Sequence, residues 1–353
     1  MEIIPIYTVE YSASIEWVIR FNSYSQDFKS YFVDVQINPK ILIGIDDYIT
    51  AATYDDIETA ETNFNTISSE ISPLLQRFSD YQLKRIDYCF NANVVELLNA
   101  FGIKCPPETT KRLMELIGKS DIPTHYEEYM QYCDTSHRKK RDPASFYLTS
   151  NSVNINFYNK SMELEKRNKE RISKNKSPVS EKHLEMAQNI FRFEVQFKYA
   201  KTYRMHTDAR DNGLSLRDEL RYFLSEDYCR KVMTDYFYRV IRRGSWYTYK
   251  DATREVARQN FNSQRKQRLI DALEFVSNCR SLAKAKSVLE SSGMTKELVT
   301  FKSTLKDLDD LGINPVTIPK DWGIRFIPNL LTVYYYMVSD LWYKDWDLSK
   351  RPK

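Results

Sequence analysis

The segment FRFEVQFK, residues 191–198, alternates apolar and polar side chains along its whole length. Successive side chains of a β-strand point to opposite faces, so this pattern predicts a strand with two unlike faces. The apolar face would carry Phe191, Phe193, Val195 and Phe197, and the polar face Arg192, Glu194, Gln196 and Lys198. We expect helices to cover the apolar face.

Three other segments alternate in the same way: YFVDVQIN at 31–38, KRIDYCFN at 84–91 and VNINFY at 153–158. We expect all four strands to form one antiparallel sheet, with one face buried under helices. The open face would then gather Gln36, Asp87, Tyr158, Glu194 and several cations. The sequence therefore predicts an α+β fold, followed by a helical C-terminal domain.

Asp87 and Glu194 would each stand at the centre of a strand on that open face. Two neighbouring carboxylates repel each other, and a hard divalent cation relieves that repulsion. Oxygen ligands favour Mg²⁺ or Mn²⁺. The alternative is that Arg85 and Arg192 neutralise the two acids without a metal.

Composition excludes several classes of protein. The chain has 353 residues but only 8 glycines, and it contains neither G-x-G-x-x-G nor a P-loop motif. Its four histidines have no metal-binding spacing, and its five cysteines form no C-x-x-C pair, which predicts free thiols in a reducing cytoplasm. We see neither a secretory signal nor an apolar run of about 20 residues, so we expect no membrane segment.

Charge is distributed unevenly along the chain, although the net charge is only +4. Residues 41–80 carry eight acids and one base, whereas residues 138–176 carry eleven bases and four acids. Residues 239–286 carry twelve bases and four acids. Two basic blocks are typical of a protein that binds a polyanion, although solvated helix faces have the same composition.

The remaining pattern is mainly helical. Helical spacing occurs at 66–82, residues 94–140 read as a helical insertion, and 160–190 read as charged helices. HTDARDNG at 206–213 interrupts the pattern, which predicts domains at 1–205 and 206–353. Further helices are expected at 214–243, 250–276, 281–291 and 295–311.

The second domain offers a candidate DNA-binding unit. Residues 281–315 predict a helix-turn-helix with its turn at 291–293 and Gly312 ending the second helix. Better phosphate contacts are the basic side chains nearby, namely Arg239, Arg242, Arg243, Arg265, Lys266 and Arg268. The aromatic segment 322–343 predicts a docking helix or core, with self-association into a homodimer as the alternative.

Four short motifs occur in a recognisable order: I-N-P-K at 37–40, K-R-I-D-Y-C-F at 84–90, F-Y-N-K at 157–160 followed by E-L-E-K-R, and F-R-F-E-V-Q-F-K. Over roughly residues 30–200 the chain resembles rolling-circle plasmid replication initiators of the Rep_trans type, which are related to relaxases of integrative conjugative elements. The resemblance implies an HUH-like or related nicking fold, and metal-dependent nicking and rejoining of DNA through a 5′-phosphotyrosine.

The resemblance assigns the nucleophile to Tyr158 and metal-supporting acids to Asp87 and Glu194, with Lys160 as a second cation. Two positions depart from the family pattern. Gln36 stands where a third acidic ligand is usual, with Asp34 as a substitute, and Asn156 stands where arginine is common. Phosphate contacts would come from Arg85, Asn156, Arg192 and Lys198.

The implied partner is an origin or transfer-origin hairpin that is single-stranded at the nick, with a host helicase recruited there. A conjugative relaxase fits the same residues. A catalytically inactive DNA-binding adaptor or repressor is the alternative that Gln36 and Asn156 support, and RNA binding by the open sheet face is a weaker one. Tyr147, on the expected hairpin partner strand, is the rival nucleophile.

Overall fold

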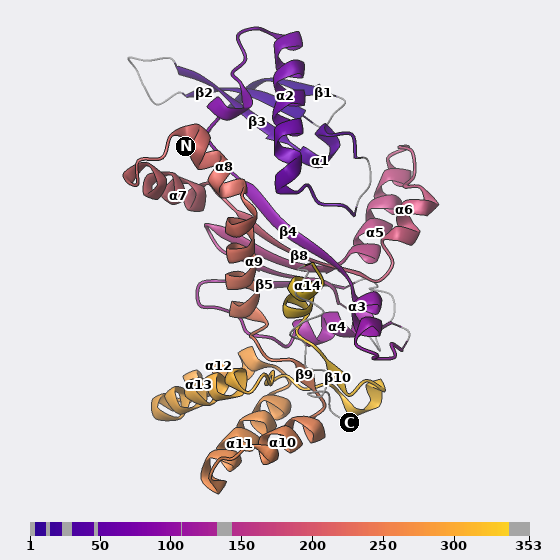
Figure 1. Cartoon of the computed structure of the whole chain (residues 1–353), viewed down its shortest axis with the longest axis vertical. Helices are drawn as coiled ribbons and strands as arrows, with labels where there is room; N and C mark the ends of the chain where they lie inside the picture. The colour runs from indigo at the N-terminus through magenta and orange to yellow at the C-terminus, as the bar shows by residue number, and fades with distance from the viewer. Residues whose placement is uncertain are drawn as a thin grey trace. The chain divides into compact units, whose positions relative to one another are not determined.

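The computed structural model describes residues 4–11, 15–22, 30–45, 49–106, 108–132 and 143–338 (Figure 1). The chain forms two compact units, each built from two segments. The first unit comprises Met1–Lys84 and Arg204–Cys229, and the second comprises Arg85–Tyr203 and Arg230–Lys353. This division differs from the predicted one into 1–205 and 206–353.

The first unit contains a three-stranded antiparallel sheet of β1 (Ile4–Tyr11), β2 (Ile15–Asn22) and β3 (Ser30–Ile37), in that order. Its core centres on Phe64 of α2 (Ile57–Ile71), whose ring lies 6.0 Å from that of Trp17. The predicted strand at 31–38 therefore exists as β3. However, the prediction that it shares a sheet with the other three strands was wrong, because β3 pairs with β2.

The predicted helix at 66–82 also differs from the observed one. Helix α2 ends at Ile71, because Ser72 precedes Pro73 and takes an extended conformation with φ −162° and ψ 133°. The short helices α1 (Pro39–Leu42), η1 (Tyr54–Asp56) and η2 (Phe78–Asp80) and the helix α8 (Leu216–Leu224) complete the unit.

The second unit is built on a five-stranded antiparallel sheet with strand order β4-β8-β7-β6-β5. Its strands are β4 (Ile86–Asn93), β8 (Ile190–Phe197), β7 (Val153–Asn159), β6 (Pro143–Thr149) and β5 (Glu127–Tyr132). The three remaining predicted strands are thus confirmed as adjacent members of one sheet. The general α+β class is confirmed with them.

Aromatic side chains fill the covered face of this sheet. Phe157 and Phe193 are fully buried, and their rings stack at 4.8 Å. Phe237 of α9 (Glu226–Val240) packs edge-on against Phe193 at 5.3 Å. Tyr334 of α14 (Leu330–Val338) lies 4.8 Å from Phe90, and Leu330, Leu331 and Val333 are buried, so the first turn of α14 belongs to the core.

The connections within the unit are largely helical. They are α3 (Val94–Ala100), α4 (Thr109–Ile117), α5 (Lys160–Ser173) and α6 (Glu181–Met186). Helix α7 (Tyr199–Asp211) follows β8, and its residues from Arg204 on belong to the first unit. The predicted helical insertion at 94–140 is only partly right, because its later part contains strand β5. Helix α7 also runs through the predicted break at 206–213 and ends before Gly213, which has φ +78°.

The C-terminal part is helical, with one two-stranded sheet of β9 (Trp246–Tyr247) and β10 (Phe326–Ile327). Its helices are α10 (Tyr249–Arg258), α11 (Ser263–Cys279), α12 (Leu282–Ser291), α13 (Thr295–Asp310) and η3 (Lys320–Trp322). The predicted helix, turn and helix at 281–315 are confirmed, and Gly312 after α13 has φ +70°. No described helix has the length and hydropathy needed to cross a membrane.

The stacked phenylalanines predict a large effect on stability. Phe157→Ala should lower the free energy of unfolding by about 3–5 kcal/mol, because it leaves a cavity beneath Phe193 and Phe237. Denaturant unfolding followed by circular dichroism measures this loss. Tyr129→Ala, at a side chain that is 56% exposed on the opposite face, should change it by no more than about 0.5–1 kcal/mol. Equal losses for the two variants would contradict the assignment of faces.

Candidate functional site

The open face of the five-stranded sheet presents three parallel rows of side chains, set by the register of the strands. The Tyr158 row runs Gln131, Ser145, Tyr158, Arg192, Asn91. The Glu194 row runs Tyr129, Tyr147, Asn156, Glu194, Cys89. The Asp87 row runs Glu127, Thr149, Asn154, Gln196, Asp87. The predicted residues Asp87, Tyr158 and Glu194 therefore share one face.

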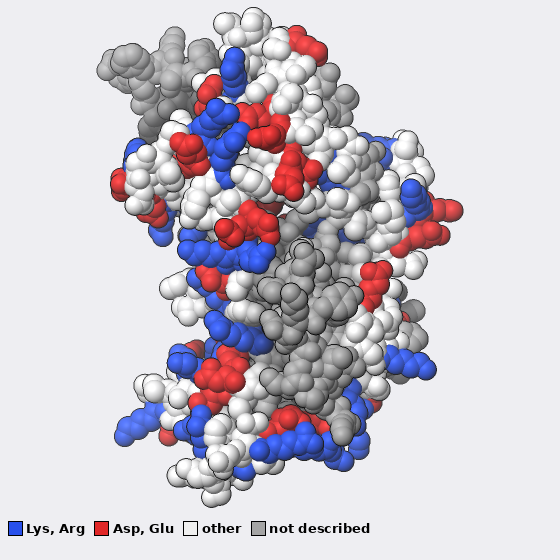
Figure 2. All heavy atoms as spheres, viewed as in Figure 1, with Lys and Arg blue, Asp and Glu red and all other residues white. Residues whose placement is uncertain are grey.

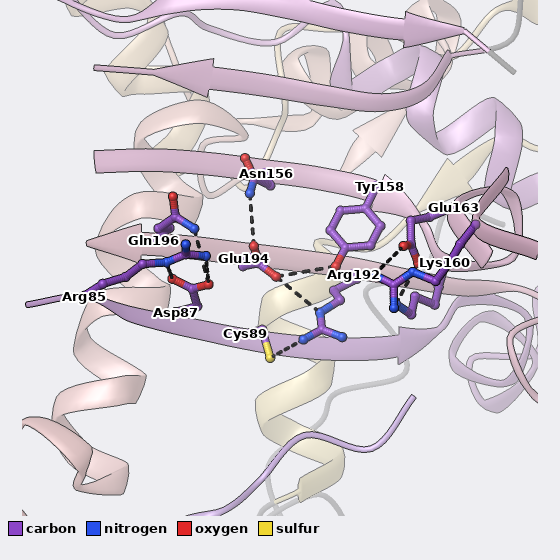
Figure 3. Close-up of polar contacts among 11 residues, drawn as sticks. Arg85, Asp87, Cys89, Asn156, Tyr158, Lys160, Glu163, Arg192, Glu194 and Gln196 are labelled. Atoms are coloured by element: carbon purple, nitrogen blue, oxygen red, sulfur yellow. Dashed lines mark hydrogen bonds and ion pairs between the residues drawn. The ribbon is translucent and has the colours of Figure 1, made fainter. Parts of the chain in front are cut away.

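Glu194 is the centre of the polar contacts on this face (Figure 3). Asn156 donates from Nδ2 to Glu194 Oε1 at 3.0 Å, and Tyr158 donates from Oη to Oε2 at 3.4 Å. The Nε atom of Arg192 lies 3.6 Å from the same Oε2. Because the carboxylate is largely withdrawn from water, these three neighbours compensate its charge.

Tyr158 is held as a neutral phenol. Burial, together with the negative charge of Glu194, raises the pKa of the Tyr158 hydroxyl well above its usual range. The hydroxyl therefore stays protonated at neutral pH and donates to Glu194. A phenol in this state reacts as a nucleophile only if a base removes its proton, and Glu194 is the carboxylate in contact with it.

Two cations flank the phenol. Arg192 is its cross-strand partner and donates from Nη2 to the Cys89 sulfur at 3.1 Å. Lys160, the first residue of α5, is buried, and its Nζ lies 5.7 Å from the centre of the Tyr158 ring. Burial lowers the pKa of Lys160, against the opposing effect of Glu163, which accepts from Nζ at 2.8 Å.

Asp87 lies in the next row and has different partners. Arg85 donates to both of its oxygens, at 2.6 and 3.0 Å, and Gln196 donates to it at 3.2 Å. Gln196 in turn accepts from Asn154, which accepts from Thr149. Arginine pairing of both acids is the arrangement that the sequence offered as the alternative to a metal.

The donor set fits a divalent cation only in part. Asp87 and Glu194 supply carboxylate oxygens, and the Asn156 Oδ1 atom is buried without a hydrogen-bond partner in the described structure. No group of three or more His, Cys, Asp or Glu residues suited to a metal occurs among the described residues. Gln36 and Asp34 lie on β3 in the other sheet, where Gln36 is exposed and Asp34 pairs with Lys84.

The predicted DNA-binding cations of the C-terminal part make contacts within the protein. Arg242 pairs with Asp309, and both Arg265 and Arg268 pair with Asp307. Arg239 and Arg243 lie over the rings of Tyr236 and Tyr238, and Lys266 donates to the Ala257 carbonyl. Figure 2 shows basic and acidic side chains interspersed over the visible face. Contact of these cations with DNA stays a prediction.

Lys198, predicted on the polar face, follows β8. Its Nζ donates to the Ser150 carbonyl at 2.7 Å and to Thr149 Oγ1 at 3.3 Å.

A separate cleft of about 1220 Å³ in the second unit is lined by α4, α12 and the chain at 118–130. None of the predicted site residues lines that cleft.

Sequence reasoning missed the contribution of β5 to this face. The segment EEYMQY at 127–132 places Tyr129 beside Tyr147 in the Glu194 row. The segment does not alternate apolar and polar side chains, so the sequence offered no signal for this strand beyond its two tyrosines. Of the predicted free thiols, Cys89, Cys105, Cys229 and Cys279 are not joined in a disulfide, whereas Cys133 lies outside the described residues.

Comparisons with protein-family models, with curated proteins and with solved structures found no match to this chain.

The contact between Glu194, Arg192 and Cys89 predicts a change in thiol chemistry. Burial raises the pKa of the Cys89 thiol, Arg192 lowers it, and the charge of Glu194 raises it further. Glu194→Gln removes one raising charge, so the thiol pKa should fall and alkylation of Cys89 should become fast at lower pH. Mass spectrometry of iodoacetamide-treated protein across pH measures this, with Cys279 as internal reference.

The matched control is Glu163→Gln, which removes an acid that contacts Lys160 instead of Arg192. This variant should leave the pH profile of Cys89 alkylation unchanged. An unchanged profile in Glu194→Gln as well would show that the glutamate does not act on the thiol.

Proposed function

We propose that this protein nicks and rejoins single-stranded DNA through a covalent bond to Tyr158, as a replication initiator does. The observation that carries the proposal is the contact between the Tyr158 hydroxyl and Glu194, with Arg192 and Lys160 beside the phenol. The proposed nucleophile and the proposed base thus lie on the open face of one sheet, with Arg192 beside them and the buried Lys160 at the start of α5. The order of the sequence motifs supports the same reaction.

The reaction is a transesterification at phosphorus. Tyr158 Oη bonds to the phosphorus as its proton passes to Glu194, and the bond between phosphorus and the 3′ oxygen breaks. The electron pair stays with the 3′ oxygen, which takes up the proton and leaves as a 3′-hydroxyl. Because the phosphotyrosine preserves the energy of the diester, reversal of these steps rejoins the strand.

The cations act on the phosphate. Arg192 has a planar guanidinium suited to two phosphate oxygens, and Lys160 supplies a second charge at the start of α5. Both lie next to the phenol, so they would stabilise the negative charge that develops on the phosphate during attack. Mg²⁺ or Mn²⁺ held by Asp87 and Glu194 would add to this stabilisation.

The family resemblance favours origin DNA as the substrate, with a helicase and a second copy of the chain as possible partners in the initiation complex. A conjugative relaxase is the second candidate, with the same chemistry on transfer-origin DNA. An inactive DNA-binding adaptor is the third. It is favoured by one observation, the pairing of both acids with arginines.

Replacement of the nucleophile tests the central step. Tyr158→Phe should abolish the covalent protein–DNA product while DNA binding is kept, because only the attacking oxygen is removed. Single-stranded oligonucleotides spanning the origin, incubated with Mn²⁺ and analysed by denaturing gel, measure the product. Tyr147→Phe is the matched control in the neighbouring strand and should keep activity; the reverse result would assign the nucleophile to Tyr147. Failure of the unaltered protein to cleave would favour the adaptor.

The carboxylates predict a separate effect. Glu194→Gln should slow cleavage by about 10²-fold or more through loss of the base.

EDTA should stop cleavage, and Asp87→Asn should raise the Mn²⁺ concentration that gives half-maximal rate. Glu127→Gln, at the far end of the Asp87 row, is the control and should leave that concentration unchanged. Equal rates with EDTA and with Mn²⁺ would contradict the metal role.

A further inference from the structure

A hollow of about 310 Å³ lies on the open face, and Asn156 is one of the residues that line it. Its side-chain walls come from β5, β6 and β7, namely Tyr129, Tyr147, Thr149, Asn154 and Asn156. Asn156 also donates to Glu194, the carboxylate that accepts from Tyr158, so one residue of the hollow contacts the proposed base. The volume lies at the small end for ligand sites and suits one planar ring system.

Two aromatic rings offer the hollow a stacking surface. Tyr129 and Tyr147 are direct cross-strand partners in the Glu194 row. Tyr129 is 56% exposed, so its ring is accessible to a ligand in the hollow. Tyrosine rings on an open sheet are the surfaces on which proteins stack the bases of single-stranded nucleic acids.

One polar atom lining the hollow has no partner. The Asn156 side chain is 8% exposed, and its Oδ1 atom is buried without a hydrogen-bond donor in the described structure. Figure 3 shows this oxygen pointing away from Glu194, on the side opposite the Nδ2 atom that donates to Glu194. The Asn154 amide, by contrast, already accepts from Thr149 and donates to Gln196. Asn156 therefore carries an unused acceptor just beneath the wall of the hollow, which a turn of its side chain would expose.

We propose that this hollow is a nucleobase subsite for the DNA strand that Tyr158 attacks. The base next to the scissile phosphate stacks on Tyr129 and Tyr147 and donates an edge N–H to Asn156 Oδ1. Asn156 lies two residues from Tyr158 on β7, about 6.6 Å along the strand, which a neighbouring nucleotide spans. The inference rests on the proposed function, because it names the part of the DNA that the same site holds.

Equilibrium binding tests the subsite without any cleavage. The probes are fluorescein-labelled pentadeoxynucleotides of each base and an abasic pentamer of the same charge, added to Tyr158→Phe protein. Introducing Tyr129→Ala as a second substitution into this Tyr158→Phe protein should weaken binding of the base-carrying probes about 5- to 100-fold. The affinity for the abasic probe should stay unchanged. The matched control is Tyr199→Ala, an exposed tyrosine on α7 outside the hollow, which should change neither.

Equal loss for base-carrying and abasic probes, or no loss for either, would overturn the subsite. A ribonucleotide pentamer that binds more tightly than its DNA counterpart would overturn the assignment to DNA. Tyr129 lies on the exposed face, so we expect the Tyr129→Ala protein to fold. The denaturant unfolding experiment described for the sheet checks this.

Covalent capture separates this inference from the proposed function. Random single-stranded DNA incubated with the unaltered protein and Mn²⁺, then sequenced from the protein-bound fraction, should show a base preference at one nucleotide beside the attachment point. Tyr129→Ala, which leaves the contacts of Glu194 in place, should weaken that preference. Attached DNA whose preference survives Tyr129→Ala would overturn the subsite and keep the nicking. Base-dependent binding with no attached DNA would overturn the nicking and keep the subsite.

Discussion

The polar face is arranged around the carboxylate of Glu194, whose buried charge must be compensated. Its charge lies mostly out of water, so it requires donors and a cation within reach. Asn156, Tyr158 and Arg192 meet this requirement from β7 and β8. The same contacts keep the phenol protonated beside a base and hold a guanidinium against it. One electrostatic demand therefore links the register of the sheet to the chemistry that the face can perform.

Much of the second unit could be predicted because alternation is a local property of the chain. Alternation assigns each side chain to a face in FRFEVQFK, KRIDYCFN and VNINFY. Those faces determine the aromatic core and the grouping of Asp87, Tyr158 and Glu194. Which residues stand directly opposite one another could not be predicted, because register depends on turns and on the partner strand. The pairing of Asp87 with Gln196 and of Glu194 with Asn156 emerged only from the structure.

Two predictions about strands were wrong because alternation and composition are local properties, whereas strand pairing depends on the rest of the chain. The strand at 31–38 alternates as well as the others do, yet alternation does not say which strand it pairs with, and β2 is closer along the chain. Strand β5 was read as part of a helical insertion, because a short edge strand rich in glutamate resembles a helix in composition. The basic side chains of α11 are a different case: Asp307 on α13 pairs with two of them, and their contact with DNA stays a prediction.

Strand β7 occupies the middle of its sheet, with β8 on one side and β6 on the other. A residue in that position is tied by backbone hydrogen bonds to both neighbours, so it moves only if two ladders open at once. The backbone of Tyr158 is consequently held in one position, unlike the backbone of a residue carried on a loop. If Tyr158 attacks DNA as proposed, the broken ends of the strand would have to move to and from a residue whose backbone stays in place.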